Sequence, residues 1–99
     1  MSTYNKIEII ISDIHLDTLI ERLEKLGITG YTTLSIDKSK GPKRGEQQLD
    51  GLLPTSHSSF FFTVTTTAIS QAIIQDIQPF LDKRGGVLII YPITYATGL

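Results

Sequence analysis

Basic residues next to glycines are the part of this 99-residue sequence best suited to chemistry, and they occur in two places. The first is Lys40-Gly41-Pro42-Lys43-Arg44-Gly45 and the second is Lys83-Arg84-Gly85-Gly86. Glycine lets backbone amides approach an anion closely, and the cations add charge-assisted hydrogen bonds. Both segments therefore favour the binding of phosphate or carboxylate. The first segment is equally consistent with a solvated loop, and the second also predicts a glycine that ends a helix.

No other residues are spaced for catalysis or metal binding. His15 and His57 stand alone, without the spacing of metal ligands, so we expect a first-turn helix residue and a loop residue. The sequence has no cysteine, which excludes disulfides and thiolate ligands, and no serine or threonine in a nucleophile elbow. Four acidic residues predict a solvated helix surface rather than a carboxylate pair: Asp13, Asp17, Glu21 and Glu24. We therefore expect neither an enzyme nor a metal site.

The first basic segment lies within a long stretch rich in Lys, Gly, Ser, Pro and Gln, from Lys38 to Ser58. The segments on either side of it are both predicted strands. A connection between neighbouring strands normally takes roughly two to five residues, and longer connections are usually functional or disordered. Function is therefore expected in the loop 38–58.

Composition excludes several classes of protein. The formal net charge of −1 argues against a general nucleic-acid binder, which would carry a strongly basic face. The longest apolar run, from Val87 to Ile93, is much shorter than the ~20 residues of a membrane-spanning helix. The residues before Ile7 show no signal peptide, so we expect a cytoplasmic protein with one domain, 1–99.

Hydrophobic periodicity predicts four strands and two helices. The first helix begins at Ser12 or Asp13 as its cap and ends at Gly27. The second helix begins at Thr67, and Pro79 should kink it or tighten a turn. The strands are predicted at Lys6–Ser12, Tyr31–Asp37, Ser59–Thr66 and Val87–Tyr95, with Gly85-Gly86 ending the second helix and Pro92 marking a bulge or the end of pairing.

The order β-α-β-β-α-β predicts an α+β, ferredoxin-like fold, in which both helices cover one face of an antiparallel sheet. In the first strand Ile7, Ile9 and Ile11 point one way, and in the third strand we expect Phe60, Phe62 and Val64 to point inward. Thr32, Leu34 and Ile36 share a face of the second strand. The uncovered sheet face would carry Ile10 and alternate residues of the last strand, and such an apolar patch predicts a closed homo-oligomer whose sheets face one another.

The segment Gly27-Ile28-Thr29-Gly30-Tyr31-Thr32 resembles the PII signal-transduction superfamily. The resemblance extends to Lys6–Ile11, to the basic loop and to the Leu-Leu-Pro before the third strand, and includes PII-like proteins linked to inorganic carbon. It implies a homotrimer of ferredoxin-like subunits that binds adenine nucleotides in the clefts between subunits. It also implies that the loop 38–58 is a T-loop that contacts a target protein.

The resemblance also implies a set of nucleotide-binding residues. Six would flank the base: Gly30, Tyr31, Thr32, Phe62, Thr63 and Val64. The T-loop would bring four to the phosphates: Lys40, Gly41, Arg44 and Gly45. Four more fall at the phosphate-cradling B-loop: Arg84, Gly85, Gly86 and Val87.

Several features of the sequence depart from the family pattern. The usual Gly-Asp-Gly-Lys of the B-loop is replaced, so the phosphate-binding lysine is missing and Arg84 is the candidate substitute. The sequence ends at Leu99, before the C-terminal arginine pair of nitrogen-regulatory members. These losses would weaken triphosphate binding most. The T-loop has no tyrosine, so it lacks the acceptor for uridylylation.

These features together predict a non-enzymatic regulatory protein that binds AMP or ADP, with or without bicarbonate, and acts on a target protein through the T-loop. The target would be a transporter or a carbon-metabolism protein. One alternative is a trimeric interaction or scaffold protein of the same fold that binds no nucleotide. Another is a divalent-metal-binding trimer like CutA, although histidine is scarce and cysteine absent.

Overall fold

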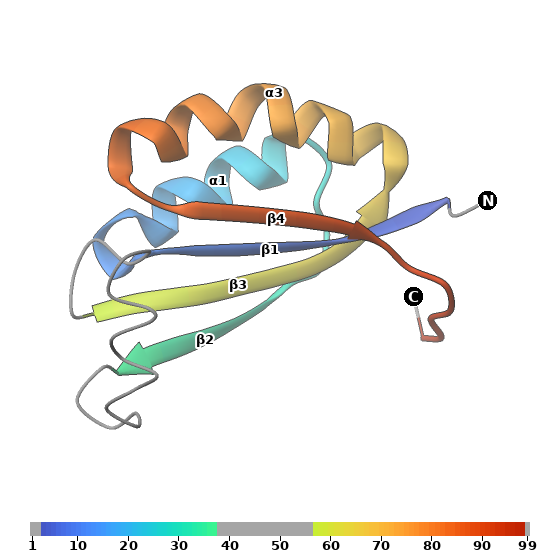
Figure 1. Ribbon diagram of the computed structural model, residues 1–99, viewed down its shortest axis with the longest axis horizontal. Helices are drawn as coiled ribbons and strands as arrows, with labels where there is room; N and C mark the ends of the chain where they lie inside the picture. The colour runs from blue at the N-terminus through green and yellow to red at the C-terminus, as the bar shows by residue number, and fades with distance from the viewer. Residues whose placement is uncertain (1–2, 38–56, 99) are drawn as a thin grey trace.

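The computed structural model describes residues 3–37 and 57–98 of the chain. Within them the elements follow the predicted order and form a four-stranded antiparallel sheet, with strand order β2-β3-β1-β4 (Figure 1). This is the ferredoxin-like arrangement expected from the sequence. The elements are β1 (Tyr4–Ser12), the 3-10 turn η1 (Asp13–His15), α1 (Leu16–Lys25), β2 (Thr32–Asp37), β3 (His57–Thr66), α3 (Thr67–Arg84) and β4 (Val87–Pro92).

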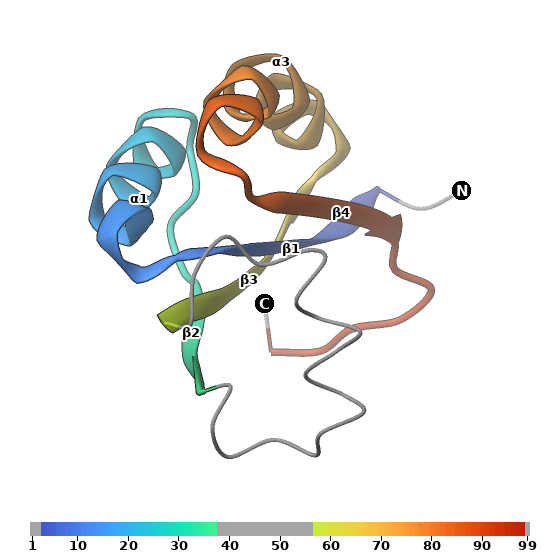
Figure 2. The same ribbon diagram turned by 60° about the vertical axis from the view of Figure 1, so that its left-hand side comes forward.

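Both helices lie side by side on one face of the sheet, and no described helix covers the other face (Figure 2). The alternation predicted for the first strand is confirmed, because Ile7, Ile9 and Ile11 are completely buried beneath the helices. Burying a large aliphatic side chain is worth about 1.5–3 kcal/mol, so this layer drives folding. The rest of the core consists of Leu19, Leu23, Ile28, Phe61, Ile73, Ile77, Phe80 and Leu81.

The face predicted for the third strand was wrong by one residue. Phe61 is fully buried under the helices, whereas Phe60, Phe62 and Val64 lie on the opposite face and are half-buried. The register explains the difference, because Phe61 pairs with the buried Ile9 of the central strand. Three consecutive phenylalanines fit either face of a strand whose side chains alternate. The pairing with β1 therefore sets which one enters the core.

The start of the first helix also differs from the prediction. A 3-10 turn over Asp13–His15 precedes α1, and neither Ser12 nor Asp13 caps the helix with its side chain. The carboxylate of Asp13 instead accepts a hydrogen bond from the hydroxyl of Ser59, at 2.6 Å. His57, predicted in a loop, is the first residue of β3. The β3 strand therefore begins earlier than the sequence pattern indicated.

Glycine ends the first helix as predicted. Gly27 has a φ of 112°, in the left-handed region that glycine tolerates best. Its N–H donates to the carbonyl of Glu24, and the N–H of Ile28 donates to the carbonyl of Leu23. These two bonds form a Schellman motif, which satisfies carbonyls left open at the helix end.

The second helix runs unbroken through its proline. Helix α3 is α-helical from Thr67 to Arg84, so the tighter turn expected at Pro79 is not observed. The Thr66 hydroxyl caps its first turn, and Gly85, with a φ of 82°, ends it. Strand β4 stops at Pro92, as the proline predicted, rather than continuing to Tyr95.

Neither α3 nor any other helix in the described residues is both long and apolar enough to cross a membrane.

Candidate functional site

A cavity of about 540 Å³ opens where the chain enters β2 and where β3 passes into α3. We call it the β2–β3 cavity. All six residues predicted to flank a base line its wall: Gly30, Tyr31, Thr32, Phe62, Thr63 and Val64. Sequence reasoning missed the rest of the lining, which consists of Tyr4, Gly27, Thr29, Thr65, Thr66, Ile69 and Gly98. With five threonines and no charged side chain in the lining, the cavity suits a neutral ring with hydrogen-bonding groups rather than a phosphate chain.

Two contacts hold the wall of the β2–β3 cavity in place. The Thr63 hydroxyl donates a hydrogen bond to the carbonyl of Gly30, which ties the segment before β2 to the middle of β3. The Tyr31 ring stacks on the fully buried Phe61 ring, with centroids 5.2 Å apart and planes at 25°. Tyr31 itself remains 43% exposed. A partly exposed ring on a fixed support is a pre-organised surface for another ring to contact.

Among the described residues, nothing gives Gly30 a steric reason to be glycine. A Cβ built on it would meet no atom of residues 3–37 or 57–98 within 4 Å. The two glycines after α3 differ, since Gly85 needs its positive φ and a Cβ on Gly86 would lie 2.6 Å from Leu81 and 3.0 Å from the Ile10 carbonyl oxygen. The fold alone therefore explains why positions 85 and 86 are glycine. At Gly30 the missing side chain keeps the cavity open instead.

Arg84, the candidate phosphate ligand of the B-loop, is directed back along its own helix. Its guanidinium lies 4.0 Å from the centre of the Phe80 ring and donates a hydrogen bond to the Phe80 carbonyl at 3.3 Å. Arg22 of α1 approaches the same ring at 4.9 Å. Phe80 thus holds two cations on the helix layer, and Arg84 would have to leave it to reach an anion beside Gly85.

The predicted site residues do not meet at one place within a single chain. Gly30 and Thr32 lie at the β2 edge of the sheet, whereas Val87 begins β4 at the opposite edge. Three strand spacings of about 4.8 Å separate these edges, which is about 14 Å. The four T-loop residues of the predicted site lie outside the described residues: Lys40, Gly41, Arg44 and Gly45.

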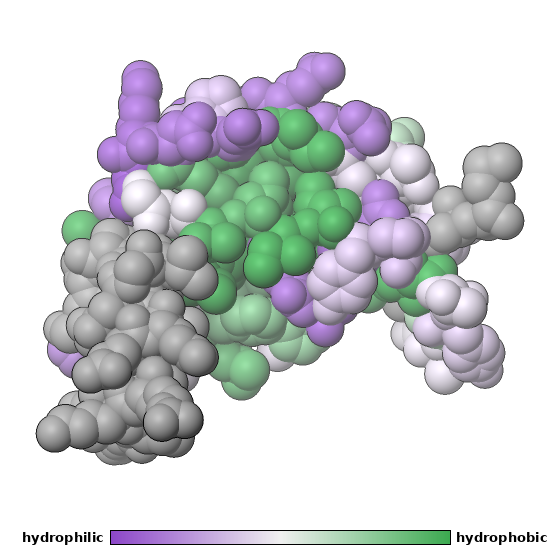
Figure 3. Space-filling model, in the orientation of Figure 1, coloured by the Kyte–Doolittle hydropathy of each residue, from purple (hydrophilic) through white to green (hydrophobic). Residues whose placement is uncertain are grey.

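A second hollow, of about 390 Å³, lies between α3 and β4 and contains only one predicted site residue, Gly86. Its wall combines aliphatic and polar side chains, and apolar side chains gather on the surface over β4 and the adjacent side of α3 (Figure 3). The lining residues are Ile74, Gln78, Leu81, Asp82, Gly86, Leu88 and Ile90. No described group of three or more His, Cys, Asp or Glu residues could hold a metal ion here or elsewhere.

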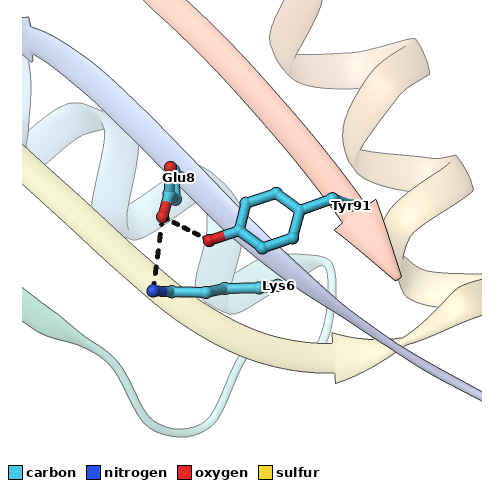
Figure 4. Close-up of polar contacts among 3 residues, drawn as sticks. All are labelled: Lys6, Glu8 and Tyr91. Carbon is cyan, nitrogen blue, oxygen red and sulfur yellow. Dashed lines mark hydrogen bonds and ion pairs between the residues drawn. The ribbon is translucent and has the colours of Figure 1, made fainter. Parts of the chain in front are cut away.

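A polar network on the uncovered sheet face was also missed by sequence reasoning. The Tyr91 hydroxyl donates to Oε2 of Glu8 at 2.7 Å, and Nζ of Lys6 lies 3.3 Å from the same oxygen (Figure 4). The hydrogen bond with Glu8 is the main reason that the pKa of Lys6 is raised above its usual 10.5. The alternation of β1 already places Lys6 and Glu8 on one face, but Tyr91 joins them only through the β1–β4 register.

The family described as Nitrogen regulatory protein P-II matches residues 4–97, almost the whole chain. No curated protein sequence matches the chain.

Solved structures of low sequence identity share the fold. CPII from Thiomonas intermedia K12, a nitrogen regulatory PII-like protein, was solved bound to ADP, AMP and acetate. It is 18% identical, with a TM-score of 0.72 over 96% of this chain and 90% of that one. The same protein bound to ADP, AMP and bicarbonate is 21% identical, with a TM-score of 0.68 over 94% of each chain. A DUF3240 family protein from Shewanella baltica OS155 is 18% identical, with a TM-score of 0.71 over 100% of this chain and 99% of that one.

Proposed function

The chain belongs to the nitrogen regulatory protein P-II family, and on this basis we propose that it is a non-enzymatic, cytoplasmic regulatory protein that binds an adenine nucleotide. The observation that carries the proposal is the β2–β3 cavity, which gathers all six residues expected beside the base. Its threonines and backbone offer donors and acceptors to a purine edge, and Tyr31 offers a ring face. The CPII structures bound to ADP and AMP support the choice of nucleotide.

The proposed nucleotide site lies between copies of the chain in a homotrimer. One chain separates the base-binding wall at Gly30 from the B-loop at Val87 by about 14 Å across the sheet. A neighbouring copy can bring its own B-loop to the base-binding wall. The uncovered apolar sheet face supports association, because monomeric proteins rarely expose such a surface.

We propose AMP or ADP rather than ATP as the preferred ligand, with bicarbonate as a candidate second ligand. The B-loop lacks the family lysine, and Arg84 is already engaged with Phe80, so few cations remain for an outer phosphate. Each lost charge-assisted hydrogen bond removes about 1.5–3 kcal/mol. The structure of CPII with bicarbonate supports testing that anion.

The output of the proposed regulator is a change in the T-loop, predicted at 38–58 and followed by β3 from His57, that alters its contact with a target protein. Lys40 and Arg44 would contact the ligand phosphates and so favour one arrangement of the loop. A ligand can shift such an equilibrium only by its difference in affinity between the two states. A transporter or a carbon-metabolism protein is the proposed target.

A second candidate is an interaction protein of the same fold that binds no nucleotide. The contact of Arg84 with Phe80 favours this candidate. Arg84 is the cation of the B-loop segment 84–87, and its guanidinium is directed away from the place where an anion beside Gly85 would lie. In this case the loop would contact its partner without a ligand switch.

Calorimetric titration separates the two candidates. The purified protein is titrated with AMP, ADP, ATP and cyclic AMP, each with and without bicarbonate, and its mass is measured by sedimentation. Micromolar binding of AMP or ADP to a trimer supports the regulator. A trimer that binds none of them supports the interaction protein, and a monomer that binds none overturns the proposal of an inter-subunit site. A parallel titration with Zn²⁺ and Cu²⁺ tests the CutA-like alternative.

A further inference from the structure

The sheet face opposite the helices carries an apolar surface with charged residues at its centre. We call this surface the open sheet face. Its apolar side chains come from all four strands, and Leu34 and Ile89 are 56% and 44% exposed. The strand register places eight apolar residues on this face: Ile10, Leu34, Ile36, Phe60, Phe62, Val64, Val87 and Ile89. A surface of this kind normally marks an interface.

The charged residues in the middle of this face are already paired with one another. Lys6 and Glu8 lie on the central strand β1, and Tyr91 lies beside them on β4 (Figure 4). Lys6 also lies 4.8 Å above the centre of the Phe62 ring of β3. The network thus spans three neighbouring strands. Its side chains are well covered for surface charges, since only 31% of Lys6 and 18% of Glu8 is exposed.

The network retains both a hydrogen-bond acceptor and hydrogen-bond donors that can bind a further group. Both contacts with Glu8 converge on Oε2, which leaves Oε1 without a contact among the described residues. The Lys6 ammonium has three donors and makes one ion pair within the described part of the chain. The face therefore offers an acceptor and donors side by side, which makes it electrically complementary to a copy of itself. A partner carrying one sign of charge would leave the other sign buried and unpaired, which is costly.

Copies of the chain meet at this face in the proposed homotrimer, and we propose that the Lys6–Glu8–Tyr91 network determines how they are oriented. Lys6 of one copy reaches Oε1 of Glu8 in the next copy, while the surrounding apolar side chains supply most of the association energy. The proposal rests on the trimer of the proposed function and names the residues that govern its assembly. Polar groups inside an apolar interface can specify register and number of chains in this way.

The test compares the removal of a carboxylate from the open sheet face with the removal of one from the helix layer. Glu8→Ala leaves the ammonium of Lys6 unpaired within the interface. Asp76→Ala breaks the Arg22–Asp76 pair, at 3.7 Å, which lies on the helix layer and away from the open sheet face. Circular dichroism first confirms that both variants are folded, and sedimentation equilibrium at several protein concentrations then gives their masses.

We expect Glu8→Ala to weaken association at least about tenfold, and Asp76→Ala to change it less than about twofold. The double variant Lys6→Met, Glu8→Leu removes both charges at once. It should still associate, but as a mixture of masses, because the apolar face has lost its orienting contacts.

The outcomes separate the inference from the proposed function. A wild-type protein that stays monomeric overturns the trimer and, with it, the assembly role of the network. A wild-type trimer whose mass survives both Glu8→Ala and the double variant unchanged overturns the network's role and leaves the trimer standing. The inference is supported if Glu8→Ala and the double variant no longer show the single trimer mass of wild type while Asp76→Ala still shows it.

Discussion

The ring of Tyr31 lies almost parallel to the ring of Phe61, 5.2 Å away, and shields that fully buried side chain at the edge of the core. One face of Tyr31 thus belongs to the folded chain, while the residue also lines the β2–β3 cavity. A single side chain therefore links the packing of the core to the wall of the proposed nucleotide site.

This link predicts that Tyr31→Ala impairs both stability and binding. Loss of the aromatic pair should lower the free energy of unfolding by about 1 kcal/mol and weaken AMP or ADP binding, whereas Tyr31→Phe should preserve both. Urea unfolding and calorimetric titration measure the two effects. Tyr95→Ala is the control, because Tyr95 is 78% exposed and lies outside the cavity lining. Equal affinity in Tyr31→Ala and wild type would refute the role of the ring in binding.

Two alanine substitutions at glycine should have opposite effects. Gly30→Ala meets no atom in the part of the chain that the structure describes, so it should leave stability within about 0.5 kcal/mol of wild type and weaken nucleotide binding by narrowing the cavity. Gly86→Ala collides with Leu81 and the Ile10 carbonyl and should destabilise the fold by about 1–3 kcal/mol. Urea unfolding and nucleotide titration of both variants test the contrast. Unimpaired binding by Gly30→Ala would mean that no ligand approaches this wall.

Removing the Arg84 side chain should lower the stability of the fold more than it lowers the affinity for nucleotide. Its contacts with the Phe80 ring and carbonyl are worth about 1 kcal/mol together, and Arg84→Ala loses both. Lys83→Ala, in the same helical turn but exposed, is the matched control. Thermal unfolding should distinguish the two variants. A large drop in ADP affinity with unchanged stability would show instead that Arg84 leaves Phe80 to bind the ligand.

Arg44→Ala should weaken nucleotide binding roughly tenfold or more and leave the oligomer intact, because a charge-assisted contact to phosphate is lost. Arg44 lies outside the described residues, so this prediction rests on the family resemblance. Titration with ADP and sedimentation of the same sample give both quantities. Unchanged affinity would remove Arg44 from the site.

The raised pKa of Lys6 predicts a loss of stability at alkaline pH. Glu8 and Tyr91 hold this pKa above its usual 10.5 in the folded chain, mainly through the hydrogen bond with Glu8. The contribution of Lys6 is therefore fully present below 10.5 and is lost as the pH rises through the folded-state pKa. Urea unfolding gives the free energy of unfolding of wild type and of Lys6→Met. The difference between the two should shrink as the pH rises over that range. A difference that stays constant would contradict the prediction.

The local patterns in the sequence were sufficient to predict most of the fold. The alternation of Ile7, Ile9 and Ile11 gives the phase of β1, and Gly27 and Gly85 end the helices because few other residues adopt their backbone angles. The phase of β3 could not be predicted in the same way. Its apolar residues fit both faces, and only pairing with Ile9 decides that Phe61 enters the core.

The candidate site could likewise be predicted only in part. The resemblance carried by Gly27–Thr32 was enough to name six residues that share one cavity. The engagement of Arg84 was harder to predict, since its spacing from Phe80 allows the contact but does not favour it over an anion. Tyr91 reaches Glu8 across 83 residues of sequence, a relationship that depends on strand register.

Gly30 and Val87 lie at opposite edges of the sheet, so the proposed nucleotide site would need two copies of the chain, and its affinity would then depend on protein concentration. If each bound nucleotide touches two copies, binding and assembly are thermodynamically linked, and each promotes the other by mass action. At high dilution the same polypeptide would hold its ligand weakly. The amount of protein in the cell would then set the threshold at which the nucleotide is sensed.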